Sequence, residues 1–223
     1  DPICPICSSP LDVVPTPENA PFRPVSFYAL TKQFQEQLIL MYAKMLGISA
    51  YALRFQNVFG PGQSLCNPYT GILAIFSNLA RSGKTMRIFE DGLESRDFIF
   101  VDDVVNAIIN CIHQDNHSVS AYNIGSGTRQ AVIDVANRIN TFFGHHSPIV
   151  TTGEYRLGDI RHSCADLSRS NKELNFFPSC NFDDGLVRFL CWAESQELPP
   201  LAYSKSMQEM SSYGLFKVTT PRN

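Results

Sequence analysis

Residues 26–63 read SFYALTKQFQEQLILMYAKMLGISAYALRFQNVFGPGQ and contain the clearest structural signal in the chain. In the first half, apolar side chains recur every three or four residues, at Phe27, Leu30, Phe34, Leu38, Met41, Tyr42 and Met45. That spacing predicts a helix of about twenty residues that ends at Gly47, a residue type suited to a helix C-terminus. The second half predicts a short buried strand over Ile48–Phe55, stopped by the Gly-Pro-Gly turn at 60–62.

The same alternation of helix and apolar strand recurs through the rest of the chain. The sequence predicts further helices over 70–83, 101–114, 130–144 and 183–196, and further strands over 86–92 and 120–127. This order indicates an α/β protein with a mainly parallel sheet. Five prolines between residues 8 and 26 predict an extended surface segment before the first helix.

The composition is that of an ordinary globular protein. The 223 residues are 44% hydrophobic and 17% charged, which is enough apolar material for a sizeable core. A net charge of −3 gives no general attraction to nucleic acid or to an anionic membrane, so we expect neither as a partner. Without an export signal or a long apolar run, we expect a cytoplasmic protein whose seven cysteines are free, mostly buried thiols.

The first predicted helix carries a tyrosine and a lysine four residues apart, Tyr28 and Lys32. Four residues turn a helix by about 400°, so the two side chains share a face and can lie beside one ligand. A free phenol ionises near pH ~10, and an adjacent cation favours the phenolate, so such a pair suits a general base. The alternative is an exposed pair with no role.

A second Y-x-x-x-K, at Tyr213 and Lys217, has Gly214 after the tyrosine and no sustained helical pattern, so we set it aside.

Five segments, in this order along roughly residues 15–197, resemble one protein family. They are PVSFYALTKQFQE, YALRFQNVFGPGQ, IFEDGLESRDFIFVDDVVNAI, YNIGSG and RLGDIRHSCADLSRSNKELNF. Together they resemble the extended short-chain dehydrogenase/reductase superfamily, in particular its NAD-dependent nucleotide-sugar epimerases and dehydratases. Within it, the segments are similar to epimerases of dTDP- or UDP-hexoses, and CPIC followed by PTPE resembles a dTDP-L-rhamnose 4-epimerase-like subgroup. The resemblance implies a 4-epimerase that works through a transient 4-keto sugar on a nucleoside-diphosphate sugar.

The implied fold is the C-terminal part of a Rossmann-type doubly wound parallel sheet, interleaved with a smaller α/β substrate-binding domain. The division we expect is a Pro-rich insert with the CxxC motif over 1–25, the end of the dinucleotide-binding domain over 26–66, a substrate-domain segment over 67–95, a return to the dinucleotide-binding domain over 96–127, the substrate-binding domain over 128–198, and a C-terminal tail over 199–223.

The resemblance also implies roles for single residues near the helix and strand. Tyr28 is the expected general base, and Lys32 is expected to support it and to reach the nicotinamide ribose of NAD. Phe55 and Gln56 are expected to lie against the nicotinamide, and Asn57 to face the sugar diphosphate.

Arginines are the expected anchors of the diphosphate, because the net charge offers no general attraction for an anion. Arg96 and Arg156 match the family's diphosphate-binding arginines, with an ordinary structural salt bridge as the alternative for each. Arg87 and Phe89 are weaker candidates for contacts with the nucleobase.

Two parts of the family pattern do not occur in this sequence. The glycine-rich G-x-x-G-x-x-G segment that holds the pyrophosphate of NAD is absent, and the expected catalytic Ser or Thr would fall near Ile3. Because the sequence begins at Asp1 rather than Met, we expect a fragment of such an enzyme that is inactive alone. A 4,6-dehydratase or a nucleotide-sugar decarboxylase would share every motif found, and a non-catalytic sugar-nucleotide-binding remnant is a further alternative.

Two further expectations concern a metal and a partner. Cys4 and Cys7 form half of a zinc knuckle, which would need further cysteines from upstream, and plain thiols are the alternative. The apolar stripe of the first helix over 33–45 predicts a homodimer contact, although the same stripe could instead face the sheet.

Overall fold

The computed structural model describes residues 3–66, 71–156, 158–198 and 216–218. The helices are α1 (Phe27–Leu46), α2 (Ile72–Arg81), α3 (Val101–Ile112), α4 (Val132–Phe142), α5 (Ser168–Leu174) and α6 (Phe182–Ser195). The strands are β1 (Ala50–Phe55), β2 (Asn57–Phe59), β3 (Met86–Ile88), β4 (Ser95–Arg96), β5 (Phe98–Phe100), β6 (Val119–Ile124), β7 (Gln130–Ala131), β8 (Ile149–Thr151), β9 (Glu154–Arg156) and β10 (Phe216–Val218).

The longer strand pairs are parallel, as the alternation of helices and strands predicts. β1 pairs with β6 from Ala50↔Val119 to Phe55↔Ile124, and β2–β5 and β3–β8 are also parallel. The short pairs β4–β7 and β9–β10 are antiparallel. The α/β class with a mainly parallel sheet is therefore confirmed.

The long helix α1 begins and ends as its sequence predicts. Ser26 caps the first turn, where its hydroxyl accepts a hydrogen bond from Ala29 N at 3.1 Å, and Gly47 ends the helix in the left-handed conformation. Ile48 was predicted to start the strand, but its N–H instead donates to Ala43 O and closes the helix.

The strand after α1 was predicted to be buried, and this is wrong. The residues of β1 are only partly buried, because among the described strands β1 pairs with β6 alone and lies at an edge. Helix α5 and the two-residue strands β4 and β7 were not predicted, because elements this short have too few residues to show a period.

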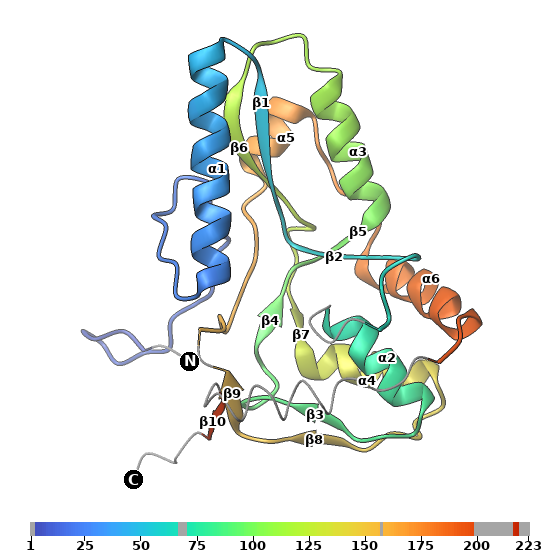
Figure 1. Ribbon diagram of the computed structural model, residues 1–223. Helices are drawn as coiled ribbons and strands as arrows, with labels where there is room; N and C mark the ends of the chain where they lie inside the picture. Colours follow the sequence, from blue (N-terminus) through green and yellow to red (C-terminus); the bar gives the residue numbers. More distant parts are fainter. Residues whose placement is uncertain (1–2, 67–70, 157, 199–215, 219–223) are drawn as a thin grey trace.

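Two hydrophobic clusters form the core. The larger joins α2, α4 and α6 around the β3 and β5 strands, with Phe59, Phe98, Phe100, Phe182 and Phe189 among its buried rings. The smaller lies between the β1–β6 pair and helices α3 and α5, and contains Ile99, Tyr122, Ile124, Leu174 and Phe176. Figure 1 shows α1 alongside β1.

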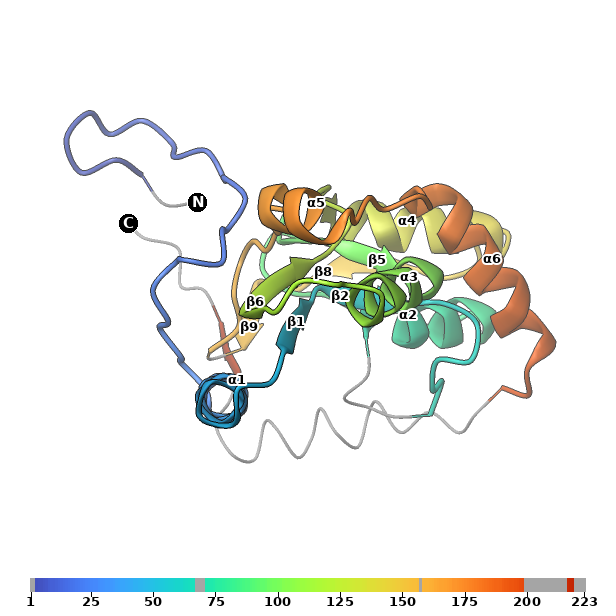
Figure 2. The ribbon, with the colours of Figure 1, turned by 90° about the horizontal axis from the view of Figure 1, so that it is seen from above.

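The Pro-rich segment before α1 is extended, as predicted, and docks at its C-terminal half. Thr16 makes a parallel bridge with Ala165, and the carbonyl of Glu18 accepts a hydrogen bond from Arg54. The carboxylate of Glu18 also accepts from Asn123 N at 2.8 Å. By contrast, Figures 1 and 2 show the first residues of the segment looping away from the body. Among the described residues, no helix is long and apolar enough to cross a membrane.

Candidate functional site

Tyr28 and Lys32 lie side by side on the first turns of α1. Lys32 Nζ is 5.7 Å from the centroid of the Tyr28 ring and donates to Gln35 Oε1 at 3.4 Å. Tyr28 is 72% exposed, so its hydroxyl is open to a ligand. The helix and the shared face are confirmed, while the catalytic role stays a prediction. The rejected second copy of the motif has Tyr213 outside the described residues and Lys217 in β10.

The carboxyl ends of β1 and β6 meet at one level, which is where ligands bind in parallel α/β sheets. Phe55 ends β1 and is 45% exposed, and Asn57 is exposed as well. Gln56 lies between them, with its N–H bonded to Ile124 O at 2.9 Å and its Oε1 accepting from the Ser163 hydroxyl at 2.9 Å. These three residues are consecutive in the chain and lie at the carboxyl end of β1, and their contacts with NAD and the sugar diphosphate stay a prediction.

Asp97, which was not among the predicted site residues, bonds to the loops that form this edge. Its carboxylate is fully buried and accepts from the N–H and hydroxyl of Ser126, each at 2.7 Å, and from the N–H groups of Gly127 and Ala165. A side chain at Gly125 would come within 2.6 Å of Asp97 Oδ2, so this close approach requires glycine. An acid directly after the predicted anchor Arg96 was the available signal.

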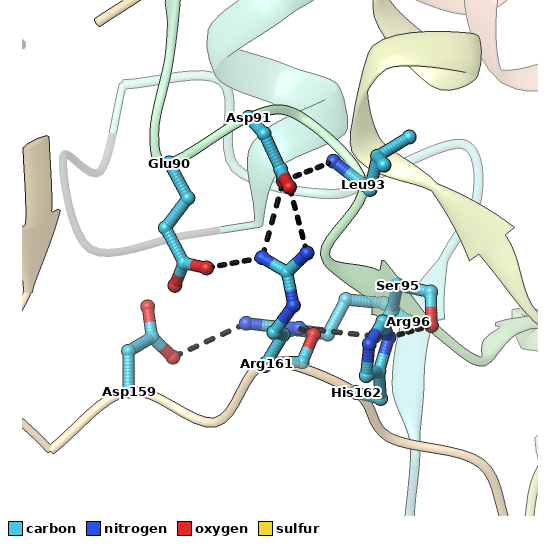
Figure 3. A network of polar contacts seen from close by, with 8 residues as sticks. All are labelled: Glu90, Asp91, Leu93, Ser95, Arg96, Asp159, Arg161 and His162. Carbon is cyan, nitrogen blue, oxygen red and sulfur yellow. Dashed lines mark hydrogen bonds and ion pairs between the residues drawn. The ribbon is translucent and has the colours of Figure 1, made fainter. Parts of the chain in front are cut away.

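Arg96 lies in β4 and points into a network of polar groups (Figure 3). Its Nη1 donates to the carbonyls of Ser95 and Arg161 at 3.0 and 2.9 Å, and its Nη2 donates to Asp159 Oδ1 at 3.2 Å. Arg96 therefore forms an ion pair with Asp159, which supports the alternative that Arg96 serves as an ordinary structural salt bridge. Because Asp159 is partly exposed, the pair is one that an anionic ligand can compete with.

Arg161 and His162 complete the network in Figure 3, and both were missed. Arg161 bonds to Glu90 and makes two hydrogen bonds to Asp91, at 3.1 and 2.8 Å, which lowers the pKa of Asp91 to about 2. His162 Nδ1 is 2.8 Å from the hydroxyl of Ser95. Partial burial, followed by the positive charges of neighbouring arginines, lowers the pKa of His162.

One of those charges belongs to Arg129, which the sequence analysis also missed. Arg129 is exposed beside β7, and its positive charge contributes to the lowered pKa of His162. Burial raises the pKa of Cys164, and the charge of Arg129 opposes that rise. Arg129 forms no ion pair with the described residues. Arg129 lies near Arg96 and Arg161, which pair with Asp159 and with Glu90 and Asp91; we call these three arginines the arginine cluster.

Glu94 is buried two residues before Arg96 and has an unsatisfied oxygen. Its Oε2 finds no hydrogen-bond partner in the described part of the chain. Burial raises the pKa of Glu94, the charges of Glu90 and Asp91 raise it further, and Arg96 acts in the opposite direction. The charged form of a buried, incompletely hydrogen-bonded carboxylate destabilises the folded state at neutral pH.

The remaining predicted contacts lie away from this edge or are only partly described. Arg87 in β3 pairs with Glu154 at 2.9 Å and is half-exposed, and Phe89 follows the same strand. The backbone of Arg156 pairs with Phe216, while its side chain lies outside the described residues. The loop after β9 returns to the start of α1, where a side chain at Gly158 would lie 3.2 Å from Val25 O.

The seven cysteines are free thiols, but the prediction that they are mostly buried is wrong, because only Cys164 is buried. The predicted metal ligands are Cys4, which is half-buried, and Cys7, which is exposed. Within the described ranges, no group of three or more His, Cys, Asp or Glu side chains is arranged to hold a metal ion.

Comparison with known proteins now assigns the family. The sequence model of the NAD dependent epimerase/dehydratase family matches residues 8–125, a span that contains Tyr28, Lys32 and Arg96. The chain belongs to this family. A dTDP-L-rhamnose 4-epimerase from Burkholderia thailandensis is 40% identical over 79% of this chain and 48% of its own length.

Solved structures agree with the family assignment. A UDP-glucose 4-epimerase from Thermotoga maritima, crystallised with UDP-glucose, has a TM-score of 0.74 and 29% identity over 83% of this chain and 59% of its own. The structure of MoeE5 in complex with UDP-glucuronic acid and NAD has a TM-score of 0.74 and 28% identity, and the match covers 82% of this chain and 60% of MoeE5. The chain thus spans about half to three-fifths of the length of the relatives it matches.

Proposed function

We propose that this chain carries the catalytic base and the sugar-nucleotide site of an NAD-dependent nucleotide-sugar 4-epimerase. The main support is the accessible pair of Tyr28 and Lys32 on one face of α1. The 40% identity to a dTDP-L-rhamnose 4-epimerase favours a dTDP- or UDP-hexose as substrate. In the division we propose, residues 26–66 and 96–127 belong to the dinucleotide-binding domain.

The residues present fit the nicotinamide end of NAD. An exposed aromatic ring at Phe55, the amide of Gln56 and the ammonium of Lys32 offer a flat apolar surface with polar donors beside it. Lys32 would donate to the ribose hydroxyls, and Phe55 and Gln56 would flank the ring. When bound, NAD supplies the acceptor and donor for the hydride at C4 of the sugar.

Tyr28 would act as the base that removes and returns the proton of the C4 hydroxyl. As C4 loses its hydride, the Tyr28 oxygen takes the proton of the C4 hydroxyl, leaving a carbonyl at C4. Lys32 stabilises the phenolate through its positive charge. When the hydride returns to the opposite face of C4, Tyr28 gives the proton back to the oxygen, so the overall reaction inverts one centre without a net change in atoms.

The diphosphate would lie on the arginine cluster. Arg96 presents a guanidinium whose acidic partner is partly exposed, and Arg129 has no ion pair among the described residues. Planar guanidinium groups suit phosphate oxygens, because each can donate two parallel hydrogen bonds. Arg156 is a proposed third anchor by family resemblance, and Asn57 faces the same edge.

Two other outcomes use the same residues. A 4,6-dehydratase or a decarboxylase would also oxidise C4 with Tyr28 as base, and a non-catalytic protein would only bind the sugar nucleotide. The natural protein, given NAD and dTDP- or UDP-hexoses deuterated at C4, separates these outcomes by NMR. We expect the label to remain at C4 in the inverted sugar. A dehydratase leaves a carbonyl at C4, so it cannot keep the label there.

Variants link this reaction to the proposed base. Tyr28→Phe removes the hydroxyl while keeping the ring, and we expect a loss of turnover of at least about 100-fold, the usual range for a general base. Tyr42→Phe is the matched control, because Tyr42 is exposed on the same helix and far along it from Tyr28. Equal activity in Tyr28→Phe and Tyr42→Phe would remove Tyr28 from the mechanism.

We further propose that α1 contacts a second copy of the protein. Ala43 is its only buried residue, and large apolar side chains are exposed along it at Phe27, Leu30, Phe34, Ile39, Met41, Tyr42, Met45 and Leu46. An apolar surface of this extent on one element marks a contact site. An isologous contact through it would give the homodimer that the sequence predicts.

A further inference from the structure

The N-terminal hairpin over residues 3–10 is a separate structure outside both hydrophobic clusters. Ile3 and Pro10 form an antiparallel bridge, Cys4 N donates to Ser9 O at 2.8 Å, and Ser8 N donates to Cys4 O at 2.9 Å. Figures 1 and 2 both show this region projecting from the body of the molecule. The epimerase chemistry proposed above uses none of these residues.

The hairpin brings two thiols to one turn. Ser8 is a non-glycine residue with φ of 58°, in the left-handed region where an L side chain costs energy. The hydrogen bond from Ser8 N to the carbonyl of Cys4 closes a turn that contains both cysteines. The Cys7 thiol is exposed and the Cys4 thiol is half-buried, so a metal ion can reach this turn from solvent.

We propose that this hairpin binds a thiophilic divalent ion of the Zn²⁺ type through the sulfur atoms of both Cys4 and Cys7. Each thiol loses its proton to solvent as its sulfur bonds to the ion, so two protons are released. Zinc in proteins prefers about four ligands, and thiolates two residues apart are a common ligand pair. The hairpin therefore supplies half of a site, and solvent or a second thiolate pair fills the other positions.

Such an ion would fix the start of the segment that leads to the catalytic helix. From Pro10 the chain runs to Thr16, whose N–H donates to Cys164 O at 2.8 Å and whose carbonyl accepts from Asp166 N at 3.1 Å. Binding at Cys4 and Cys7 would thus hold both ends of the stretch between the hairpin and Thr16.

Titration of the reduced chain with Cd²⁺ tests the proposal, because sulfur-to-cadmium charge transfer absorbs in the ultraviolet and grows with each bound thiolate. We expect saturable absorption equal to two thiolates per ion, or four if two chains share one ion, and displacement of the Cd²⁺ by Zn²⁺. Cys4→Ser and Cys7→Ser should each lose most of it. Cys191→Ser is the matched control, since Cys191 is an exposed single thiol on α6.

Ser8→Gly provides a second check of the geometry. Glycine adopts the left-handed conformation without strain, so this variant should keep the absorption and bind Cd²⁺ at least as tightly. Unchanged helical circular dichroism would confirm that the variants fold, as expected for residues outside the core. Absorption that is absent in the wild type, or that survives in the Cys4→Ser, Cys7→Ser double variant, would overturn the proposal.

Discussion

Individual buried carboxylates shape the candidate site more than its exposed ion pairs do. Asp97 is fully buried, and both of its oxygens accept hydrogen bonds from loops that are distant in sequence. Exposed pairs such as Arg87–Glu154 contribute little, because water and salt screen them. Asp97 therefore holds the loops at Ser126 and Ala165 beside β4 and β5.

Asp97→Asn should lower the free energy of unfolding by about 2–4 kcal/mol, because an amide cannot accept from all the donors that the carboxylate satisfies. Urea denaturation followed by circular dichroism measures this change. Asp115→Asn, at an exposed aspartate, should change stability by less than about 0.5 kcal/mol. If Asp97→Asn lost as little stability as Asp115→Asn, the loops would keep their positions without the Asp97 carboxylate.

Glu94→Gln should stabilise the protein at neutral pH, by on the order of 1 kcal/mol, or about 2–4 °C in Tm. Because the folded-state pKa of Glu94 is raised, its protonated form favours folding at acidic pH, below its unfolded pKa. That stability is lost as the pH rises through the folded pKa. The two proteins should therefore converge at acidic pH, whereas a difference independent of pH would contradict the assignment.

At the level of single residues, the sequence predicted what spacing can reveal. Tyr28 and Lys32 could be found because four residues on a helix define a shared face. Arg129, Arg161 and His162 could not, because their proximity depends on strands that pair across long sequence separations. Only the fold brings them beside Arg96.

At the scale of the elements, α6 packs closely against the β2–β5 pair. Gly185 faces Phe59 and Phe100, and a Cβ there would approach each ring to 2.9 Å. The long elements were predictable because their apolar periods extend over several turns. Helix α5 and strands β4 and β7 were not, since their positions follow from partners elsewhere in the chain.

Gly185→Ala should cost about 1–3 kcal/mol, although alanine is the better helix former, because the added methyl group forces the two rings apart. Differential scanning calorimetry gives the change in stability. Glu194→Ala in the same helix is the control, since Glu194 is exposed and its side chain has no partner among the described residues. A stabilised Gly185→Ala protein would show that the rings move aside at no cost.

At the scale of the whole molecule, two features stand out: the exposed apolar surface of α1 and the absence of a glycine-rich cofactor motif from the sequence. The large apolar side chains of α1 are exposed, and these 223 residues contain no G-x-x-G-x-x-G segment for the pyrophosphate of NAD. Sequence alone could not decide whether the α1 stripe faces the sheet. The structure leaves most of it exposed, since Ala43 is the helix's only buried residue.

Phe34→Glu should reduce self-association of the protein, because it places a charge within the apolar face of α1. Sedimentation velocity over a range of concentrations measures the dimer fraction, with Gln37→Glu as a control for charge alone. An unchanged dimer in Phe34→Glu, or a monomeric wild type, would argue against α1 as the contact.

A polypeptide of these 223 residues alone should bind a nucleoside diphosphate without oxidising its sugar. Spectroscopic assay with NAD and UDP- or dTDP-hexoses should detect no turnover, because the sequence has no glycine-rich segment for the pyrophosphate of the cofactor. Turnover by this polypeptide would show that the residues around Tyr28 and Lys32 suffice to bind NAD.

Isothermal titration calorimetry of UDP and dTDP against the chain, in the wild type and in Arg96→Met, is the most direct test of the sugar-nucleotide site. We predict that the wild type binds at least one of the two and that Arg96→Met weakens this binding about 10- to 100-fold, equivalent to about 1.4–2.8 kcal/mol. Arg138→Met, which breaks a surface ion pair with Asp183, should bind like the wild type. Equal affinity in Arg96→Met, or no binding by the wild type, would contradict the assignment of the arginine cluster as the diphosphate site.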